Sequence, residues 1–289
     1  MTTEHLPSLL EQMREPAYSR LKTLYVECRT AFKTNPTSQI DLMAYENRDN
    51  EHSYTLLKGL IPATLVGHSP PTNIGAPWQT SDTFFTDFKQ RHPEDQVLSE
   101  DRYSLIIGNR ASYDTRQYFD KPALAGMSFM HLLVIPKDKV YNIVCLDNAQ
   151  IVEEMILHFK SFWKAPGSIE KIIKCIQLGV DTREKAVISN FQESKDQGAT
   201  DFDQIMKEVR RDGLQLAEEL RRRQCSEKLE DLILFGFHPA PLASVGHLHM
   251  HVLLAPVEFR RFSTGVHDHK TVPAQAVIEV LKEEASRTV

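Results

Sequence analysis

Three histidines alternate with apolar residues between positions 245 and 254, which read Val-Gly-His-Leu-His-Met-His-Val-Leu-Leu. Side chains of a β-strand point alternately to the two faces of a sheet, so a strand here places three imidazoles on one face and apolar groups on the other. An imidazole is a poor packing group, because both ring nitrogens need partners when they are buried. The stretch therefore predicts a strand with a core face and a reactive face that carries His247, His249 and His251.

Two kinds of chemistry suit such a row of imidazoles. Neutral imidazoles can hold a metal ion, as they do in zinc hydrolases. Alternatively, one histidine attacks phosphorus while its neighbours orient the phosphate and supply protons. No matching carboxylate signature accompanies the histidines, so a zinc-dependent hydrolase stays the alternative, and we expect neither a metal nor another cofactor. A third interpretation is a polar-faced strand that carries its histidines by chance.

The composition limits the partners that the chain can have. Its 289 residues, 41% of them hydrophobic, suffice for one large domain or two small ones with a substantial core. A net charge of -5 gives no general attraction for nucleic acid or anionic membranes, so a small anionic ligand held by a local site fits better than a polymer. Without an apolar run or a signal-like start, we expect no membrane partner and a location in the cytoplasm or nucleus. The four cysteines form no CxxC pair and are expected to be reduced packing residues.

The chain divides into four predicted regions. Apolar residues at helical spacing, interrupted at Pro16, make the first region partly helical. The second and fourth regions carry the strand candidates, whereas the third has the composition of amphipathic helices. The regions are an N-terminal extension (1–100), the first half of a sheet domain (101–163), a helical insertion (164–230) and the second half with the histidines (231–289).

Three segments outside the histidine stretch are strand candidates, because polar or turn residues bound their consecutive apolar side chains. They span residues 103–108, 130–137 and 231–237. A helix is expected over 148–162, with an apolar stripe formed by Ile151, Met155, Ile156, Phe159 and Phe162.

Two residue clusters allow both a structural and a functional interpretation. The aromatic residues Trp78, Phe84, Phe85 and Phe88 are typical of a core, although such a group can also wall a ligand pocket. The basic run Arg221–Arg223 could face a phosphate, but a solvated helix end is favoured, because cations interact well with a helix C-terminus.

The histidine stretch and its flanking residues together resemble the histidine triad (HIT) superfamily of nucleotide hydrolases and transferases. Residues 235–239, Phe-Gly-Phe-His-Pro, and 254–257, Leu-Ala-Pro-Val, look most like the type-3 histidine triad nucleotide-binding proteins. The strand candidate Met-His-Leu-Leu-Val-Ile-Pro-Lys at 130–137 looks like the family's first half, but Lys137-Asp138-Lys139 replaces the Lys-Lys-His that the family often carries.

The resemblance implies an α+β fold with a HIT-like antiparallel five-stranded sheet and helices, here enlarged by the N-terminal extension and an inserted helical subdomain. Small relatives are homodimers whose sheets join. The added segments could preserve or block that contact, so a homodimer is expected only if they leave it open.

The resemblance also implies a reaction at the α-phosphate of a nucleotide. His249 would attack phosphorus and form a covalent nucleotidyl-histidine intermediate, and water would then release a nucleoside monophosphate such as AMP. His247 and His251 would reach the phosphate oxygens and favour the charge that develops there. A nucleotide phosphoramidate is the expected small-molecule substrate.

Further site residues follow from matches to the family's motifs. Ser244 matches a serine that contacts the phosphate, although a turn hydroxyl is an equal interpretation. Asp120 matches an acidic residue that binds the ribose hydroxyls, and its alternative is a turn-capping aspartate. His238 matches an upstream histidine and is expected close to the nucleotide, whereas we expect His131 to be structural.

Two alternatives stay open at the level of sequence. The insertion could adapt the pocket to a dinucleoside polyphosphate, a nucleotide-sugar, a cap-like remnant or a non-nucleotide metabolite. The chain could also be a non-catalytic nucleotide-binding or scaffold protein that retains the triad. Turnover of an adenosine phosphoramidate separates an enzyme from such a protein.

Overall fold

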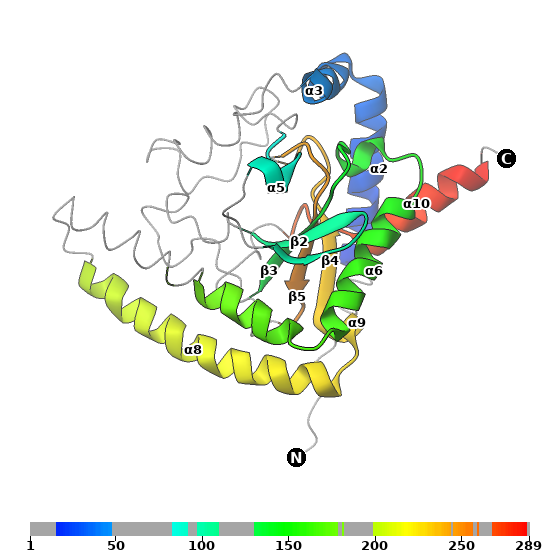
Figure 1. Ribbon diagram of the computed structural model, residues 1–289. Helices are drawn as coiled ribbons and strands as arrows, with labels where there is room; N and C mark the ends of the chain where they lie inside the picture. The colour runs from blue at the N-terminus through cyan, green and yellow to red at the C-terminus, as the bar shows by residue number, and fades with distance from the viewer. Residues whose placement is uncertain are drawn as a thin grey trace.

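The computed structural model describes residues 16–47, 83–91, 97–109, 130–178, 181, 199–243, 245–256, 259 and 268–287. This part of the chain combines helices with an open six-stranded antiparallel sheet, so the protein belongs to the α+β class (Figure 1). The strand order across the sheet is β1-β2-β3-β5-β4-β6. The strands are β1 (Val97–Glu100), β2 (Ser104–Gly108), β3 (His131–Pro136), β4 (Ile233–Phe237), β5 (Met250–Leu254) and β6 (Val272–Pro273).

The expectation of five strands is wrong by one, and two of the six strands are too short to be recognised from sequence. β1 has four residues, Val-Leu-Ser-Glu, and β6 has only two. Neither offers the run of apolar residues by which a strand is recognised. β1 lies in the segment that we assigned to the N-terminal extension, yet it pairs with β2.

The helices lie mainly on one side of the sheet. α2 (Tyr18–Thr34), α6 (Gln150–Lys164) and α10 (Ala274–Arg287) share one core with it, on the side away from α5 (Phe88–Arg91) (Figure 1). Within 164–230, residues 168–178 are helical and lie beside α8, because Arg221 of α8 bonds to Glu170 at 2.8 Å. The other described helices are α3 (Pro36–Asn47), the 3-10 helix η6 (Ile143–Cys145), α8 (Ala199–Ser226) and α9 (Leu229–Leu232).

Both faces of the sheet are covered, and this explains why β3 is buried along its whole length rather than at alternate residues. The face that we call the core face meets the helices through side chains such as Leu132, Val134, Met250 and Val252. The opposite face, called the site face, has a smaller cluster that packs on the segment 83–91. This cluster contains Phe85, Phe88, Leu105, Ile107, Leu133, Ile135 and Val245.

The helix α6 begins and ends within two residues of the expected bounds, but its buried stripe is rotated. Met155, Phe159 and Phe162 are buried as expected, and Val152 joins them, whereas Ile151 and Ile156 are only partly buried. The predicted stripe is therefore confirmed at its centre, and Ile151 and Ile156 pack against the core from its edge.

The N-terminal helix α2 is held firmly against the rest of the fold. The Tyr25 hydroxyl donates to the carbonyl of Ile143 at 2.9 Å. The buried Arg29 guanidinium donates to the carbonyl of Val144 at 2.8 Å and to both carboxylate oxygens of Glu284 on α10. A bidentate pair of this kind is geometrically specific, so it fixes α2 relative to the C-terminal helix.

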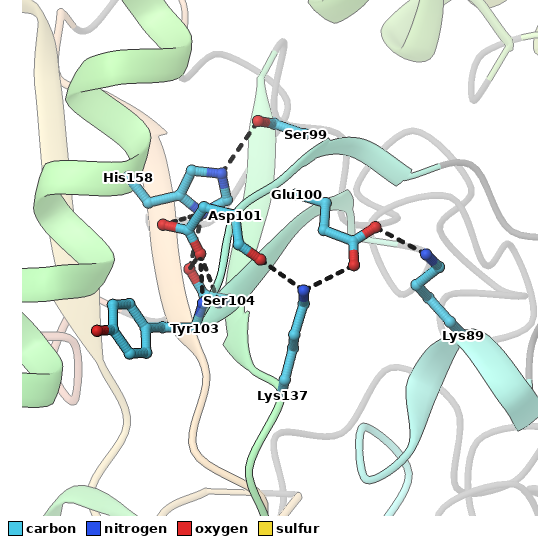
Figure 2. A network of polar contacts seen from close by, with 8 residues as sticks. All are labelled: Lys89, Ser99, Glu100, Asp101, Tyr103, Ser104, Lys137 and His158. Atoms are coloured by element: carbon cyan, nitrogen blue, oxygen red, sulfur yellow. Dashed lines mark hydrogen bonds and ion pairs between the residues drawn. The ribbon is translucent and has the colours of Figure 1, made fainter.

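The hairpin of β1 and β2 is braced by the polar network in Figure 2. The Asp101 carboxylate accepts from the backbone N–H of Tyr103 at 2.8 Å and of Ser104 at 2.7 Å, which closes the turn. His158 of α6 lies 3.0 Å from the Ser99 hydroxyl and 2.7 Å from that of Ser104. Burial lowers the pKa of His158, so its neutral ring links the hairpin to α6.

Gly236 on β4 is required by a close approach to Thr271. A Cβ atom added at Gly236 would lie 2.5 Å from Cγ2 of Thr271, whose side chain is buried. We expect Gly236→Ala to reduce the free energy of unfolding by about 1–3 kcal/mol, because Thr271 must rotate or β4 must shift. Gly213→Ala is the control, since nothing lies within 4 Å of that Cβ in α8 and the change should stabilise by about 0.5–1 kcal/mol. Urea unfolding measures both, and equal effects would contradict the packing argument.

Candidate active site

The strand β5 carries one histidine of the triad, and the chain just before it carries the other two. Met250 and Val252 point into the core face, as the alternation predicted. His251 lies on the site face, in a cross-strand row with Leu133 of β3 and Gly236 of β4. His247 forms an isolated bridge with Tyr141, so the histidines reach the site from extended chain and not from one continuous strand.

The ring of His251 lies beside three other imidazoles. Its ring centroid is 5.0 Å from that of His249, 5.1 Å from that of His131 and 4.2 Å from that of His238. Its Nδ1 lies 2.8 Å from Nε2 of His131. His131 is therefore in direct contact with the triad, which goes beyond the structural role expected from sequence.

Asn109, directly after β2, continues this chain of polar contacts. Its amide nitrogen lies 3.1 Å from Nδ1 and 3.0 Å from Nε2 of His131. An amide nitrogen only donates. When it donates to Nδ1, the proton of His131 lies on Nε2 and is donated to Nδ1 of His251. When it donates to Nε2 instead, that nitrogen also accepts from Nδ1 of His251, so the contacts allow two arrangements of the protons.

His249 has a defined tautomer. Its Nδ1 lies 2.7 Å from the backbone carbonyl of His247, and a carbonyl oxygen only accepts, so the Nδ1 proton is donated there. Nε2 then bears the lone pair. The ring is only 7% exposed and packs against Phe85, with centroids 5.1 Å apart. In the uncharged ring, a nitrogen able to act as a base or nucleophile therefore lies among buried side chains.

His247 is fully buried, and both of its ring nitrogens are bonded within the protein. Nε2 donates to the carbonyl of Pro136 at 3.0 Å. Nδ1 lies 2.9 Å from the Thr86 hydroxyl and 3.1 Å from that of Tyr45. Burial is the main cause that lowers its pKa to about 3. We expected His247 to reach the phosphate, but both of its ring nitrogens are hydrogen-bonded within the protein. The side chain is therefore placed to hold its own backbone in position.

His238 lies beside the triad, as expected from its motif. Its Nε2 lies 3.2 Å from the Thr271 hydroxyl, and its backbone carbonyl accepts from the Asn142 amide at 2.9 Å. The Asn142 oxygen accepts from the backbone N–H of Ala240 at 2.8 Å. Asn142 thereby fixes both ends of the 238–240 segment, and with it the His238 ring against His251.

The segment 83–91 covers the site face next to His249. Phe85 and Phe88 belong to the apolar cluster there. Glu100 of β1 accepts from Lys89 at 2.7 Å and lies 2.7 Å from Lys137, which follows β3 (Figure 2). Both lysines hold the pKa of Glu100 at about 2, with Lys137 the larger cause. The aromatic residues Phe84, Phe85 and Phe88 are therefore core, as favoured, and Phe85 also borders His249, whereas Trp78 lies outside the described residues.

Other predicted residues do not join the cluster in the part of the chain that the structure describes. Ser244 and Asp120 lie outside the described residues. The arginines 221–223 pair with carboxylates, namely Glu170, Glu218, Glu219 and Glu227. The run lies near the C-terminal end of α8, as favoured, but Arg223 is not fully solvated, because its guanidinium lies over the Phe259 ring.

A metal centre has no support from the described residues. Among them, no group of three or more His, Cys, Asp or Glu side chains is arranged to hold a metal ion. The three triad histidines cannot ligate one metal as they stand, because His247 donates from one ring nitrogen and accepts at the other.

In comparisons with known proteins, no protein-family model, no curated protein and no solved structure matches this chain. None of the helices in the described ranges is long and apolar enough to cross a membrane.

Sequence reasoning missed five polar residues that contact the histidines or their backbone, namely Asn109, Asn142, Tyr45, Thr86 and Thr271. Asn109 and Asn142 each follow or precede a short element, and Tyr45 and Thr86 come from the N-terminal segment. Each is a single polar residue in a segment without a motif, so no periodicity or spacing signals it. Only the tertiary structure brings them to the site.

Proposed function

We propose that the protein is a hydrolase of the histidine triad type, acting at the α-phosphate of a nucleoside monophosphate amide or ester through a covalent nucleotidyl-histidine intermediate. The observation that carries the proposal is the 2.7 Å hydrogen bond from His249 Nδ1 to the carbonyl of His247. It leaves the lone pair on Nε2 and also stabilises the positive charge that the ring acquires when Nε2 bonds to phosphorus.

The first step transfers the nucleotidyl group to His249. The Nε2 lone pair forms a bond to the α-phosphorus, and the bond from phosphorus to the leaving amine or oxygen breaks. The electron pair departs with the leaving group, which takes a proton from Nε2 of a protonated His251, whose ring is left neutral. The proximity of the two rings supports this assignment, because their centroids are 5.0 Å apart.

The second step returns the enzyme to its starting state. Water bonds to phosphorus, and the bond from phosphorus to Nε2 of His249 breaks and restores the lone pair. The proton of the water returns to His251, and a nucleoside monophosphate is released. The contact with His131 supports this role of His251, because Nε2 of His131 lies 2.8 Å from Nδ1 of His251 and can accept the second proton of the charged ring.

The same contact supports a HIT-like arrangement of the central strands. His251 on β5 lies beside β3, and His131 begins β3 directly across from Leu253. The motif strand with Leu-Val-Ile-Pro-Lys and the triad strand are thus neighbours in an antiparallel sheet. This is what two halves of one catalytic domain require, and it makes the nucleotide phosphoramidate the first substrate to test.

The test is turnover of adenosine 5′-phosphoramidate by the full-length protein in the presence of a chelator. We expect AMP and ammonia in equal amounts, with a rate indifferent to chelator and added zinc. A phosphoanhydride such as a dinucleoside polyphosphate, assayed in parallel, reports the leaving group. A rate that vanishes with chelator and returns with zinc would replace the proposal by the metal-dependent hydrolase, and absence of AMP from every substrate would leave a non-catalytic binding protein.

A further inference from the structure

The carbonyl that orients the nucleophile belongs to a residue that the N-terminal segment holds in place. The His247 carbonyl accepts from Nδ1 of His249. The His247 ring is hydrogen-bonded to the Pro136 carbonyl and lies within hydrogen-bond distance of the Thr86 and Tyr45 hydroxyls. Because the interior is closely packed, a displacement of the buried His247 ring would strain its backbone and so shift the carbonyl. The geometry of His249 therefore depends on the partners of His247.

The proton positions around His247 follow from which groups can only accept. The Pro136 carbonyl accepts a hydrogen bond from Nε2–H of His247. In the neutral ring Nδ1 therefore carries no proton and must accept. The Tyr45 hydroxyl has one proton and lies 3.0 Å from the carbonyl of Val140, which can only accept it. The Thr86 hydroxyl, 2.9 Å from Nδ1, is consequently the donor to His247.

We propose that Thr86 is a positioning residue for the nucleophile, acting through His247 to fix the carbonyl that aligns His249. The proposal rests on the proposed function and adds that the N-terminal segment completes the active site. The chain of contacts runs from Thr86 Oγ1 to His247 Nδ1, through the His247 backbone, and from its carbonyl to His249 Nδ1.

The α5 segment (residues 83–91) is built to hold Thr86 still. The Arg91 guanidinium donates to the carbonyl of Thr83 at 2.6 Å and of Thr86 at 3.1 Å. Lys89 bonds to Glu100 of β1, as Figure 2 shows. Phe85 and Phe88 anchor the segment in the apolar cluster of the site face. Thr86 itself is buried, so its hydroxyl has a fixed neighbour in His247.

The same segment provides a matched control. Thr83 is as deeply buried as Thr86, but within the described residues its hydroxyl has no hydrogen-bond partner. Replacing either threonine with valine keeps the shape and removes only the hydroxyl. A purely structural role of the segment predicts similar effects of the two changes, whereas a positioning role predicts that only Thr86→Val slows the reaction.

The kinetic test compares Thr86→Val, Thr86→Ser and Thr83→Val on adenosine 5′-phosphoramidate. We expect Thr86→Val to lower kcat about 10- to 100-fold with little change in KM, since it misaligns the attacking atom without touching the substrate. The kcat of Thr86→Ser, which keeps the hydroxyl, should stay within a few-fold of the wild-type value. The kcat of Thr83→Val should equal that of the wild type. Equal rates for Thr86→Val and the wild type would overturn the proposal.

A second measurement does not depend on turnover. In the wild-type protein, the ring-nitrogen NMR shifts of His247 should report a single neutral tautomer with the proton on Nε2 from pH 5 to 8. In Thr86→Val the Nδ1 shift should change, because its donor is gone. If this holds but the wild type releases no AMP, the proposed function fails and not the contact. A mixture of tautomers or a charged His247 at pH 7 in the wild type would overturn the proposal itself.

Discussion

Replacing His249 with alanine is expected to lower the rate of AMP release by about 10⁴-fold or more, because removal of a nucleophile eliminates the covalent route. The other imidazoles and the apolar wall remain, so substrate should still bind. His249 precedes β5 and contributes no strand pairing. The fold should therefore survive, with a change in the free energy of unfolding of about 1 kcal/mol.

The matched control for this substitution is His269→Ala, which removes an exposed imidazole. Its rate should equal that of the wild type. Steady-state release of AMP measures both variants, and thermal unfolding checks that each is folded. A His249→Ala protein that is folded and keeps more than a tenth of the wild-type rate would show that another group attacks phosphorus.

Acidification is expected to destabilise the fold through His247. Its pKa is about 3 in the folded protein, mainly because of burial, against 6.5 in the unfolded chain. Between these values the unfolded chain binds a proton that the folded protein does not. The stabilisation is therefore complete above pH 6.5 and is lost as the pH falls toward 3, at about 1.4 kcal/mol per pH unit for this one group.

The charges near His247 both raise and lower its pKa. Asp87 favours the protonated ring, whereas His249 and Lys139 oppose it, and all three are smaller causes than burial. Urea unfolding of the wild type and of His247→Gln at pH 8, 7, 6 and 5 measures the contribution. The variant should be less stable at pH 8, since hydrogen bonds are lost. Its free energy of unfolding should fall less steeply with acid, because unfolding of the variant takes up about one proton fewer. Identical slopes would mean that His247 titrates near its ordinary pKa.

The sequence predicted the parts of the fold that repeat a pattern. The alternation around the triad correctly predicted that Met250 and Val252 point into the core. Helical spacing correctly predicted α6, including its buried residues Met155 and Phe159. It overextended the triad strand, because extended chain and a paired strand have the same alternation. β5 begins only at Met250, and His247 is instead paired in an isolated bridge to Tyr141.

The candidate site was predictable only where a motif marks it. The pattern identified His249, His251 and His238, which the structure brings together. It could not assign different tasks to the three triad histidines, since burial and partners decide them. The hydroxyls of Tyr45 and Thr86 lie 202 and 161 positions from His247 in the sequence. Contacts over such separations depend on how α3 and the α5 segment fold back onto the sheet.

The most direct test of the central claim is to trap the covalent intermediate. The full-length protein would be mixed with adenosine 5′-phosphoramidate in a single turnover, quenched in alkali, where phosphoramidates of histidine persist, and mapped by peptide mass spectrometry. The account predicts one adenylyl group on the peptide that contains His249, rising before AMP appears and absent from His249→Ala. An adduct on another residue, or AMP released at full rate without any adduct, would contradict it.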